Sequence, residues 1–356
     1  MRSLDAESSG RVPKLDPVRK LGLVCLVAVA CFHPPGAVAL DFTSAATYSL
    51  RSGGDALIVW QGGKTLHESY RTAASAHSRT NAQSITKSIS ALALFIAAGR
   101  GYVDLDAPIP SMSVKKGASI TARDLLNQTS GLNPGYSALY GHRLKNKAST
   151  ALSLKSLSSP GTAFVYGPSH YEVLETVLAQ SLKCDPSGTL RFIQSSLLGP
   201  LGIQCGNWQQ DAAGRPYFSA GATLNPQEAL RLGRLLADGG RRWIFPLVPA
   251  KHLEAAALGS KANPAYGMGF WLNKNSLKPD SAEEDVEKAI RGAKTSSQWS
   301  RFCLSRQAPS DLIAMVGSGG QRIYVSPSQK LVIVRFGHGS GFEDPIFLKT
   351  LFASAR

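Results

Sequence analysis

The chain has 356 residues, and its 39 Lys and Arg residues outnumber its 24 Asp and Glu residues, which gives a formal net charge of +15 at pH 7. This length suffices for one large domain or two interleaved ones. The basic residues are dispersed rather than gathered in a stripe with aromatic residues, so the charge favours solubility and weak attraction to anionic surfaces and argues against nucleic-acid binding.

The first 39 residues have the pattern of an export signal. Arg19 and Lys20 precede an apolar run at 21–32, and Ala37-Val38-Ala39 fits a small-residue cleavage site. The run is shorter than the roughly 20 residues that a membrane span needs, and no other stretch is long and apolar enough. We therefore expect an exported, periplasmic protein whose mature domain is 40–356; secretion, or a lipid anchor on Cys31, is less favoured.

In the first half of the chain, the pattern predicts short elements around one longer helix. A β-hairpin is expected at 55–61 and 64–70, with two glycines in its turn. The longer helix begins at Ser84 and runs to about Ala98, where the glycines of 99–101 stop it. The shorter elements are a helix at 42–52, an extended stretch at 104–109 and a helix that Thr121 caps and that runs through Asn127.

In the second half, helices come first and strands last. The stretch 133–150 is expected to be a loop, and 274–300 a polar surface insertion with one helix around 281–291. The remaining expected helices are 170–183, 189–198, 226–239 and 344–355, and the expected strands are 266–273, 323–325 and 331–336.

Strands thus lie near both ends of the chain, and helices fill the middle. This grouping predicts an α+β fold in which one antiparallel sheet is assembled from both chain ends. The sheet part is about 40–70 and 215–356, with flanking helices, and the inserted helical part is about 71–214.

Ser84 and Lys87 lie one turn apart on the predicted helix, so their side chains share a face. A serine hydroxyl is a weak nucleophile unless a base lies within hydrogen-bond reach, and a lysine amine is such a base only when neutral. The turns that follow are apolar, and burial lowers the pKa of a lysine. The same spacing recurs at Ser113 and Lys116 in a polar stretch, so the pattern alone does not identify a nucleophile, and a serine at this position is also a common helix cap.

Three cysteines lie beyond residue 39, at positions 184, 205 and 303. In an oxidising compartment the pair nearest in sequence, Cys184 and Cys205, is the candidate disulfide. The remaining thiol has no local His partner, which argues against a catalytic cysteine. No cluster of His, Asp or Glu has metal-ligand spacing, so neither a metal nor another cofactor is expected.

Several motifs resemble those of the serine β-lactamase-related hydrolases, in order and spacing as well as in sequence. They include Gln83-Ser-Ile-Thr-Lys-Ser88, Gly101-Tyr-Val-Asp-Leu-Asp-Ala-Pro108, Thr129-Ser-Gly-Leu132, Phe164-Val-Tyr-Gly167, Gly199-Pro-Leu-Gly-Ile203 and Tyr266-Gly-Met-Gly-Phe-Trp271. This family includes class C β-lactamases, D-alanyl-D-alanine carboxypeptidases, family VIII carboxylesterases and 6-aminohexanoate-dimer hydrolases. The resemblance covers roughly Ala45 to the end of the chain and implies a β-lactamase/transpeptidase-like fold.

The resemblance implies catalytic roles for three side chains. Ser84 would be the nucleophile, Lys87 its general base and Tyr166 the group that gives a proton to the leaving group. In the family the tyrosine is followed one residue later by asparagine, whereas Pro168 stands there in this chain. This departure puts the orientation of the substrate in doubt more than the chemistry. The backbone N–H groups of Ser84 and Ser318 would form the oxyanion hole.

The family's third motif, Lys/His-Thr-Gly on the edge strand that faces the serine, falls at Met315-Val316-Gly317, where only the glycine is kept. Its cation lies near the substrate carboxylate in class C β-lactamases, so Met315 argues against β-lactams as the natural substrate. The residues that follow look like the Gly-Gly-Gln version found in relatives of the 6-aminohexanoate-dimer hydrolases. The candidate substrate-binding residues here are Gly317, Gly319, Gly320 and Gln321.

Tyr136 and Tyr140 are two further candidate substrate-binding residues, because aromatic side chains on a loop can close over a bound acyl group. A plain surface loop is an equally good interpretation of the same stretch.

The resemblance therefore implies an exported serine hydrolase that cleaves an ester or amide of a small molecule or peptide through an acyl-enzyme. Two alternatives remain: a cell-wall-peptide carboxypeptidase or amidase with the same residues, and a protein of the penicillin-recognising fold that binds cell-wall peptides without turnover. The sequence leaves the oligomeric state and the natural acyl and leaving groups open.

Overall fold

The computed structural model describes residues 40–113, 119–140, 144–339 and 341–353. The predicted export signal at 1–39 lies outside these residues, as does part of the second Ser-x-x-Lys pattern. Within the described ranges, no helix combines the length and the apolar character that crossing a membrane requires.

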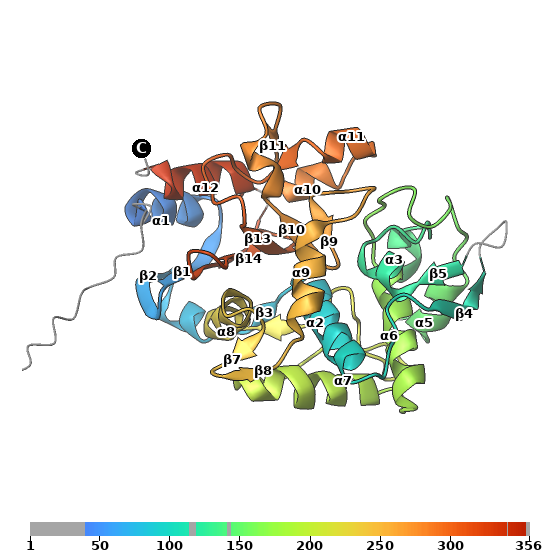
Figure 1. Cartoon of the computed structure of the whole chain (residues 1–356). Coiled ribbons are helices and arrows are strands. Elements are labelled where there is room, and N and C mark those ends of the chain that lie inside the picture. Colours follow the sequence, from blue (N-terminus) through green and yellow to red (C-terminus); the bar gives the residue numbers. More distant parts are fainter. Residues whose placement is uncertain (1–39, 114–118, 141–143, 340, 354–356) are drawn as a thin grey trace, which may run out of the picture. The chain divides into compact units, whose positions relative to one another are not determined.

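One antiparallel sheet of seven strands is built from both ends of the chain, as the sequence predicted (Figure 1). Its strands, in spatial order, are β2 (Lys64–Tyr70), β1 (Gly54–Gln61), β15 (Leu331–Gly337), β14 (Gln321–Ser326), β13 (Ile313–Gly317), β10 (Phe270–Leu272) and β9 (Tyr266–Gly267). The pairing of β1 with β15 joins the two ends, with Ile58 opposite Val334.

Short two-stranded pairs complete the strands among the described residues. They are β3 (Thr80–Asn81) with β6 (Thr223–Leu224), β4 (Pro108–Ser113) with β5 (Ser119–Thr121), β7 (Arg241–Arg242) with β8 (Phe245–Pro246), and β11 (Ala282–Glu283) with β12 (Phe302–Cys303). Of these strands, β3 lies closest in sequence to the predicted nucleophile.

Helices cover both faces of the sheet, because alternate side chains of its central strands are apolar on both sides. Ile58 of β1 packs in the cluster that holds α2 (Ile85–Gly99) and α8 (Pro226–Ala237), whereas Val59 packs in the cluster that holds α1 (Phe42–Arg51) and α12 (Asp344–Leu351). The strands β14 and β15 are buried along their whole length, which fits a sheet between two layers of helices.

The other helices lie between these elements in the chain. They are α3 (Ala122–Leu126), α4 (Tyr136–Leu139), α5 (Lys147–Leu152), α6 (Ser169–Leu182), α7 (Gly188–Ile193), α9 (Ala250–Leu258), α10 (Val286–Ala289) and α11 (Ser296–Trp299). Single turns of other helix types occur at η1 (Ala73–Ala76), η2 (Gln194–Leu198), η3 (Gly199–Leu201) and η4 (Lys274–Leu277). The predicted capping of α3 by Thr121 is confirmed, since Thr121 and Asp124 form a reciprocal capping box.

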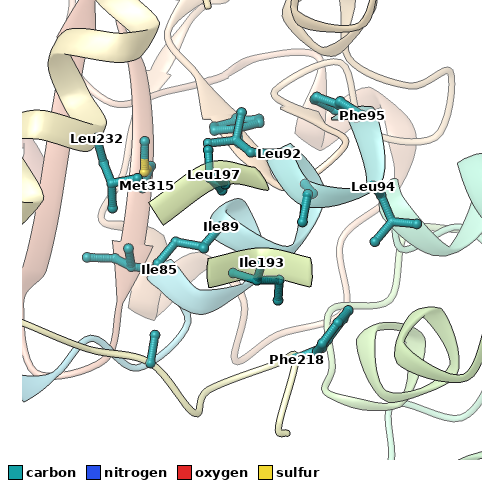
Figure 2. Close-up of a cluster of buried hydrophobic side chains, with 14 of the residues drawn as sticks. Ile85, Ile89, Leu92, Leu94, Phe95, Ile193, Leu197, Phe218, Leu232 and Met315 are labelled. Carbon is teal, nitrogen blue, oxygen red and sulfur yellow. The ribbon is translucent and has the colours of Figure 1, made fainter. Parts of the chain in front are cut away.

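Helix α2 is the centre of the larger core (Figure 2). Most of its side chains are apolar, and every residue from Ile85 to Ala97 is buried, as expected for a helix surrounded by protein. In Figure 2, Ile85 and Ile89 lie near Met315 of the sheet and Leu232 of α8. This burial fixes the first turn of α2, which carries Ser84 and Lys87.

Three expectations about local structure are wrong, and one helix was missed. The stretch 133–150 contains α4 and α5 rather than only a loop. The predicted strand 266–273 is split into β9 and β10, because Met268 and Gly269 adopt positive φ angles of 42° and 101°. The stretch 274–300 buries apolar side chains such as Trp299 against the sheet instead of lying only on the surface, and α9 was not expected.

The candidate disulfide is also wrong, since Cys184 and Cys205 are free thiols in the structure. They lie in different surroundings. Cys184 is at the end of α6 beside Asp185 and Arg191, whereas Cys205 lies near Arg79. Proximity in sequence does not bring the two sulfur atoms together here.

Candidate active site

A cavity of about 520 Å³ opens at the first turn of α2 and brings together most of the residues singled out from the sequence. Its walls come from α2, α4, the segment around Tyr166, the segment 209–220, α10 and the turn after β13. The lining residues are Asn81, Gln83, Ser84, Lys87, Tyr136, Tyr140, Tyr166, Gln209, Ala220, Glu287, Ile290, Arg291 and Ser318.

Ser84 stands at the N-cap position of α2, but its hydroxyl makes no capping hydrogen bond. The preceding Gln83 has a φ of 52°, an uncommon conformation for a residue with a side chain, and the turn is held by a 2.7 Å hydrogen bond from Gln83 N–H to Asn81. Thr86 Oγ1 donates to the carbonyl of Gln83 at 2.6 Å and stabilises the same turn. The chain thus enters α2 abruptly and leaves the Ser84 hydroxyl facing the cavity.

Lys87 is buried, and its amine has two hydrogen-bond partners. Nζ lies 3.0 Å from Ser84 Oγ and donates to the carbonyl of Ser219 at 3.0 Å. Burial lowers the pKa of Lys87 to about 7; the negative charge of Glu172 opposes this shift and the positive charge of Lys147 reinforces it. A large fraction of Lys87 is therefore neutral at pH 7 and able to accept a proton.

Tyr166 faces Lys87 from the other side of the cavity, with its ring centroid 5.0 Å from Nζ. Gln128 holds the backbone around it, because its carbonyl accepts from Val165 N–H at 3.0 Å and its side chain accepts from Gly167 N–H at 2.6 Å. Burial raises the pKa of Tyr166 well above its ordinary value, although a hydrogen bond with Ser84 acts in the opposite direction. Tyr166 is therefore a neutral phenol, which can give a proton.

These three side chains form an arrangement suited to acyl transfer. The Ser84 hydroxyl can rotate to donate its proton to a neutral Lys87 amine, because the 3.0 Å separation suits a hydrogen bond in either direction. Tyr166 then lies close enough to both groups to hand a proton to a leaving group. The geometry supplies a nucleophile, a base and an acid in one cavity.

The candidate oxyanion donors, Ser84 and Ser318, both line the cavity. Neither N–H group donates to another described residue. Strand β13 ends just before Ser318 and is not an edge strand, contrary to expectation, because β10 pairs with Ile313 and Ala314. Beyond Ala314 this side of β13 has no strand partner in the described structure, which leaves its end open toward Ser84.

Gly317 is required by a close approach of protein backbone rather than by a substrate. A Cβ atom at this position would lie 2.3 Å from the carbonyl oxygen of Ala82, so any side chain would push β13 away from the turn that precedes Ser84. The glycine therefore sets the distance between the two sides of the candidate oxyanion hole.

The other candidate substrate-binding residues after β13, which are Gly319, Gly320 and Gln321, bond to the protein itself. The N–H groups of Gly319 and Gly320 donate to the carboxylate of Glu287 at 3.3 and 3.1 Å. The side-chain amide of Gln321 bonds to the backbone of Gly337 on β15. None of these three residues lines the cavity, so they are better described as anchors of the β13–β14 turn.

Met315 is 1 % exposed and packs in the core beneath α2 instead of lining the cavity (Figure 2). The position that carries a cation in class C β-lactamases is therefore part of the apolar core in this protein.

Tyr136 and Tyr140 line the cavity, and their rings lie 6.0 Å apart. Tyr136 is 44 % exposed, whereas the hydroxyl of Tyr140 donates to Ser219 Oγ at 3.2 Å. Both residues belong to α4 or its C-terminal cap. The pair is thus a structured wall of the cavity.

Several residues at the site had no signal in the sequence. Glu287 and Arg291 line the cavity although they come from a stretch expected to be surface, and Ser219 accepts the hydrogen bond from Lys87. Buried behind Ser219 are Lys147 and Glu172. Only the fold brings these positions together, because no local pattern marks them. No group of three or more potential metal ligands occurs in the described part of the chain.

Comparisons with known proteins agree with this architecture. A structure from Bacteroides dorei, assigned as a β-lactamase, matches with a TM-score of 0.65 and 18% identity over 89% of this chain and 98% of that chain. A Bacillus anthracis protein assigned as a 6-aminohexanoate-dimer hydrolase matches with a TM-score of 0.62 and 16% identity over 83% of this chain and 77% of that one.

A third structure, of EstCE1, a hydrolase with promiscuous acyltransferase activity, matches with a TM-score of 0.63 and 13% identity over 88% of this chain and 98% of that one. At these identities the structures establish the fold alone. The search of curated proteins gave no match. The family model for Beta-lactamase, however, matches residues 42–351, which is most of the chain. On its cavity, its fold and this match, the chain belongs to the Beta-lactamase family.

Proposed function

We propose that this protein is a serine hydrolase that cleaves an ester or amide bond through an acyl-enzyme on Ser84. The observation that carries the proposal is the meeting of Ser84, Lys87 and Tyr166 in one cavity, with Lys87 Nζ 3.0 Å from Ser84 Oγ. Serine acyl transfer to ester and amide substrates is the chemistry of the β-lactamase-fold family to which the chain belongs.

In the first half of the reaction, Ser84 Oγ attacks the substrate carbonyl while the neutral Lys87 amine takes the hydroxyl proton. The negative charge that develops on the carbonyl oxygen is stabilised by the N–H groups of Ser84 and Ser318. The bond to the leaving group then breaks, and Tyr166 supplies the proton that the departing alcohol or amine needs. Lys87 returns a proton to Tyr166, so the three groups act as one unit.

In the second half, water attacks the carbonyl of the acyl group on Ser84, and the bond to Ser84 Oγ breaks. A proton of the water passes to Lys87 or the Tyr166–Lys87 pair, and Ser84 regains its own proton as the acid product leaves. Every proton taken up in one half is released in the other, so the cycle needs no further reactant besides water.

The substrate is an ester or amide other than a β-lactam. The support is Met315, whose burial leaves no cation at the position that faces a β-lactam carboxylate in class C enzymes. A carboxypeptidase or amidase that acts on cell-wall peptides would use the same three residues. A binding protein without turnover is less well supported, because binding alone would not need a lysine with a pKa near 7 beside a serine.

We also propose that the chain is exported to the periplasm after cleavage behind Ala39, on the pattern of 19–39. N-terminal sequencing of protein recovered from a periplasmic fraction should then begin near Leu40. Recovery from the cytoplasm with residues 1–39 intact would count against export.

The function is tested by a panel of short p-nitrophenyl esters, D-amino-acid amides and nitrocefin on the mature protein, together with labelling by a fluorophosphonate. An ester or amide should be turned over, and mass spectrometry should place the label on Ser84. Binding of a cell-wall peptide without turnover or labelling would favour the binding protein instead.

A further inference from the structure

A buried ion pair lies behind the cavity and is not used by the acyl-transfer steps. Lys147 Nζ lies 3.8 Å from Glu172 Oε1, and both side chains are only 2 % exposed. Lys147 comes from α5 and Glu172 from α6, two helices that pack against each other. Burying two charges costs about as much as their attraction returns, so a gain in stability is a poor explanation for the pair.

Glu172 connects this pair to the wall of the cavity through Ser219. Its carboxylate accepts hydrogen bonds from Phe218 N–H at 3.4 Å, from Ser219 N–H at 3.2 Å and from Ser219 Oγ. The carbonyl of Ser219 accepts the hydrogen bond from Lys87 Nζ, and its Oγ accepts one from Tyr140. Ser219 is therefore held from behind by Glu172 and in turn holds the Lys87 amine.

Lys147 is anchored through its backbone, because its N–H donates to Asp211 at 2.8 Å. Its Nζ is buried without a hydrogen-bond partner among the described residues, and it lies over the ring of Tyr217 and 5.5 Å from the ring centroid of Tyr140. The carboxylates that act on its positive charge are those of Glu172, which has the larger effect, and Asp211.

The titratable groups that face Lys87 come from several elements. They are Ser84 of α2, Tyr166, His170, Tyr171 and Glu172 of α6 and the segment before it, and Lys147 of α5. Burial keeps the two tyrosines protonated and lowers the pKa of His170 to about 4, so these three are neutral at pH 7. Glu172 and Lys147 are the charged members of the set.

Building on the proposed role of Lys87 as general base, we propose that Glu172 and Lys147 are positioning residues that hold Ser219 against Lys87 while cancelling each other's charge. A carboxylate alone could anchor Ser219, but it would also stabilise the protonated form of Lys87. Lys147 beside it repels that form. The pair thus lets a carboxylate anchor Ser219, whose carbonyl binds Lys87, while Lys147 offsets the effect of the negative charge on Lys87.

Two substitutions that keep the approximate shape of the side chain separate the contribution of the Glu172 charge from that of the Lys147 charge. Glu172→Gln removes the negative charge and keeps a side-chain oxygen that can accept from Ser219. Lys147→Met removes the positive charge and keeps the length of the side chain. Because burial lowers the pKa of Lys147 only to about 8, Lys147 is largely protonated where Lys87 titrates, and its loss matters there.

The experiment measures the rate of fluorophosphonate labelling of the mature protein against pH. The pH of half-maximal rate should fall by about one unit in Glu172→Gln and rise by about one unit in Lys147→Met, since one buried charge nearby shifts a pKa on this order. The double variant should return to within a few tenths of a unit of the wild type. Lys145→Met is the matched control, because Lys145 is exposed two residues earlier, and it should leave the midpoint unchanged.

A purely structural role for the pair would lower the labelling rate without moving the two midpoints in opposite directions, and that result would overturn the proposal. A second measurement needs only the wild-type protein, so it does not depend on whether the variants fold. NMR of wild-type protein labelled at lysine Cε should show two amines that titrate in the neutral range, near 7 and 8. A Lys87 curve with no inflection as Lys147 titrates would also overturn the proposal.

Different results would contradict the role of Ser84 and the role of the Lys147–Glu172 pair. Labelling at the wild-type rate in Ser84→Ala would contradict the proposed function. Labelling that depends on Ser84, with midpoints that do not move in the pair variants, would contradict only the role of Lys147 and Glu172.

Discussion

The amine of Lys87 lies 3.0 Å from the hydroxyl of Ser84 across the first turn of α2, inside the candidate active-site cavity. Ser84 occupies the position of a helix cap without forming the capping hydrogen bond. The Ser84 side chain therefore contacts Lys87, three residues further along the helix, and does not cap the start of the helix.

The rate of ester hydrolysis should rise with pH and reach half its maximum near pH 7, because the pKa of Lys87 is lowered to about 7 by burial. Only the neutral amine can take the proton of Ser84, so below this pKa the rate should fall about tenfold per pH unit. Tyr166 stays protonated through this range, since its pKa is raised well above 10. The check is kcat/KM for a p-nitrophenyl ester, corrected for spontaneous hydrolysis. A flat profile between about pH 5 and pH 8 would speak against Lys87 as the base.

Lys87 and Tyr166 should show losses that do not add, because both take part in the same proton transfers. Lys87→Ala should remove nearly all activity, and Tyr166→Phe should cost on the order of a hundredfold in kcat, the usual worth of one positioned proton-transfer group. The double variant should be little worse than Lys87→Ala alone. Kinetics of the purified variants with one ester measure this. Fully multiplicative losses would show that the two residues act independently.

Tyr136 and Tyr140 should contribute to substrate binding, because both side chains line the cavity. Tyr140→Ala should raise KM several-fold and also lower kcat, since it removes the hydrogen bond to Ser219 beside Lys87. Tyr136→Phe should have a smaller effect confined to KM. Tyr102→Phe, an exposed tyrosine outside the cavity, serves as the control. If KM and kcat were unchanged in both variants, Tyr136 and Tyr140 would have no role in substrate binding.

Nitrocefin should be hydrolysed far more slowly than short esters, by roughly a hundredfold or more, because a missing ion-pair partner costs a few kcal/mol. Met315→Lys should not create a β-lactamase. Its side chain would enter the core between α2 and the sheet, where an unpaired charge destabilises the fold by several kcal/mol. Met315→Leu, which roughly conserves volume, should cost less than about 1.5 kcal/mol. Thermal melts and nitrocefin assays on both variants test this, and efficient cephalosporin hydrolysis by the wild type would refute it.

The sequence predicted the parts of the molecule whose signals are local. The glycine turn of the β1–β2 hairpin, the apolar run of α2 and the cap at Thr121 are each contained within a few neighbouring residues. The sheet built from both chain ends followed from where the strands lie in the chain. Ser84 and Lys87 were identified because a helix turn relates them directly.

The parts that depend on long-range packing could not be predicted in this way. Ser219 reaches Lys87 from 132 positions away. Glu287 of α10 and Arg291 just after it line the cavity, although the polar composition of their stretch suggested a surface. Gln321 fitted a family motif, yet its side-chain amide is hydrogen-bonded to the backbone of Gly337 on β15. Cys184 and Cys205 were paired on sequence distance alone, which says nothing of the direction of the two side chains.

The central claim is that Ser84 is the nucleophile, and fluorophosphonate labelling of Ser84→Ala beside the wild type tests it most directly. If Ser84 acts as proposed, the wild type carries one label on Ser84, and the variant melts within a few degrees of the wild type but neither takes up label nor hydrolyses esters. If Ser84 were only a helix cap, the variant would lose about 1 kcal/mol of stability and keep its rate per folded molecule. A stable Ser84→Ala protein that is labelled and hydrolyses esters at the wild-type rate would contradict the account.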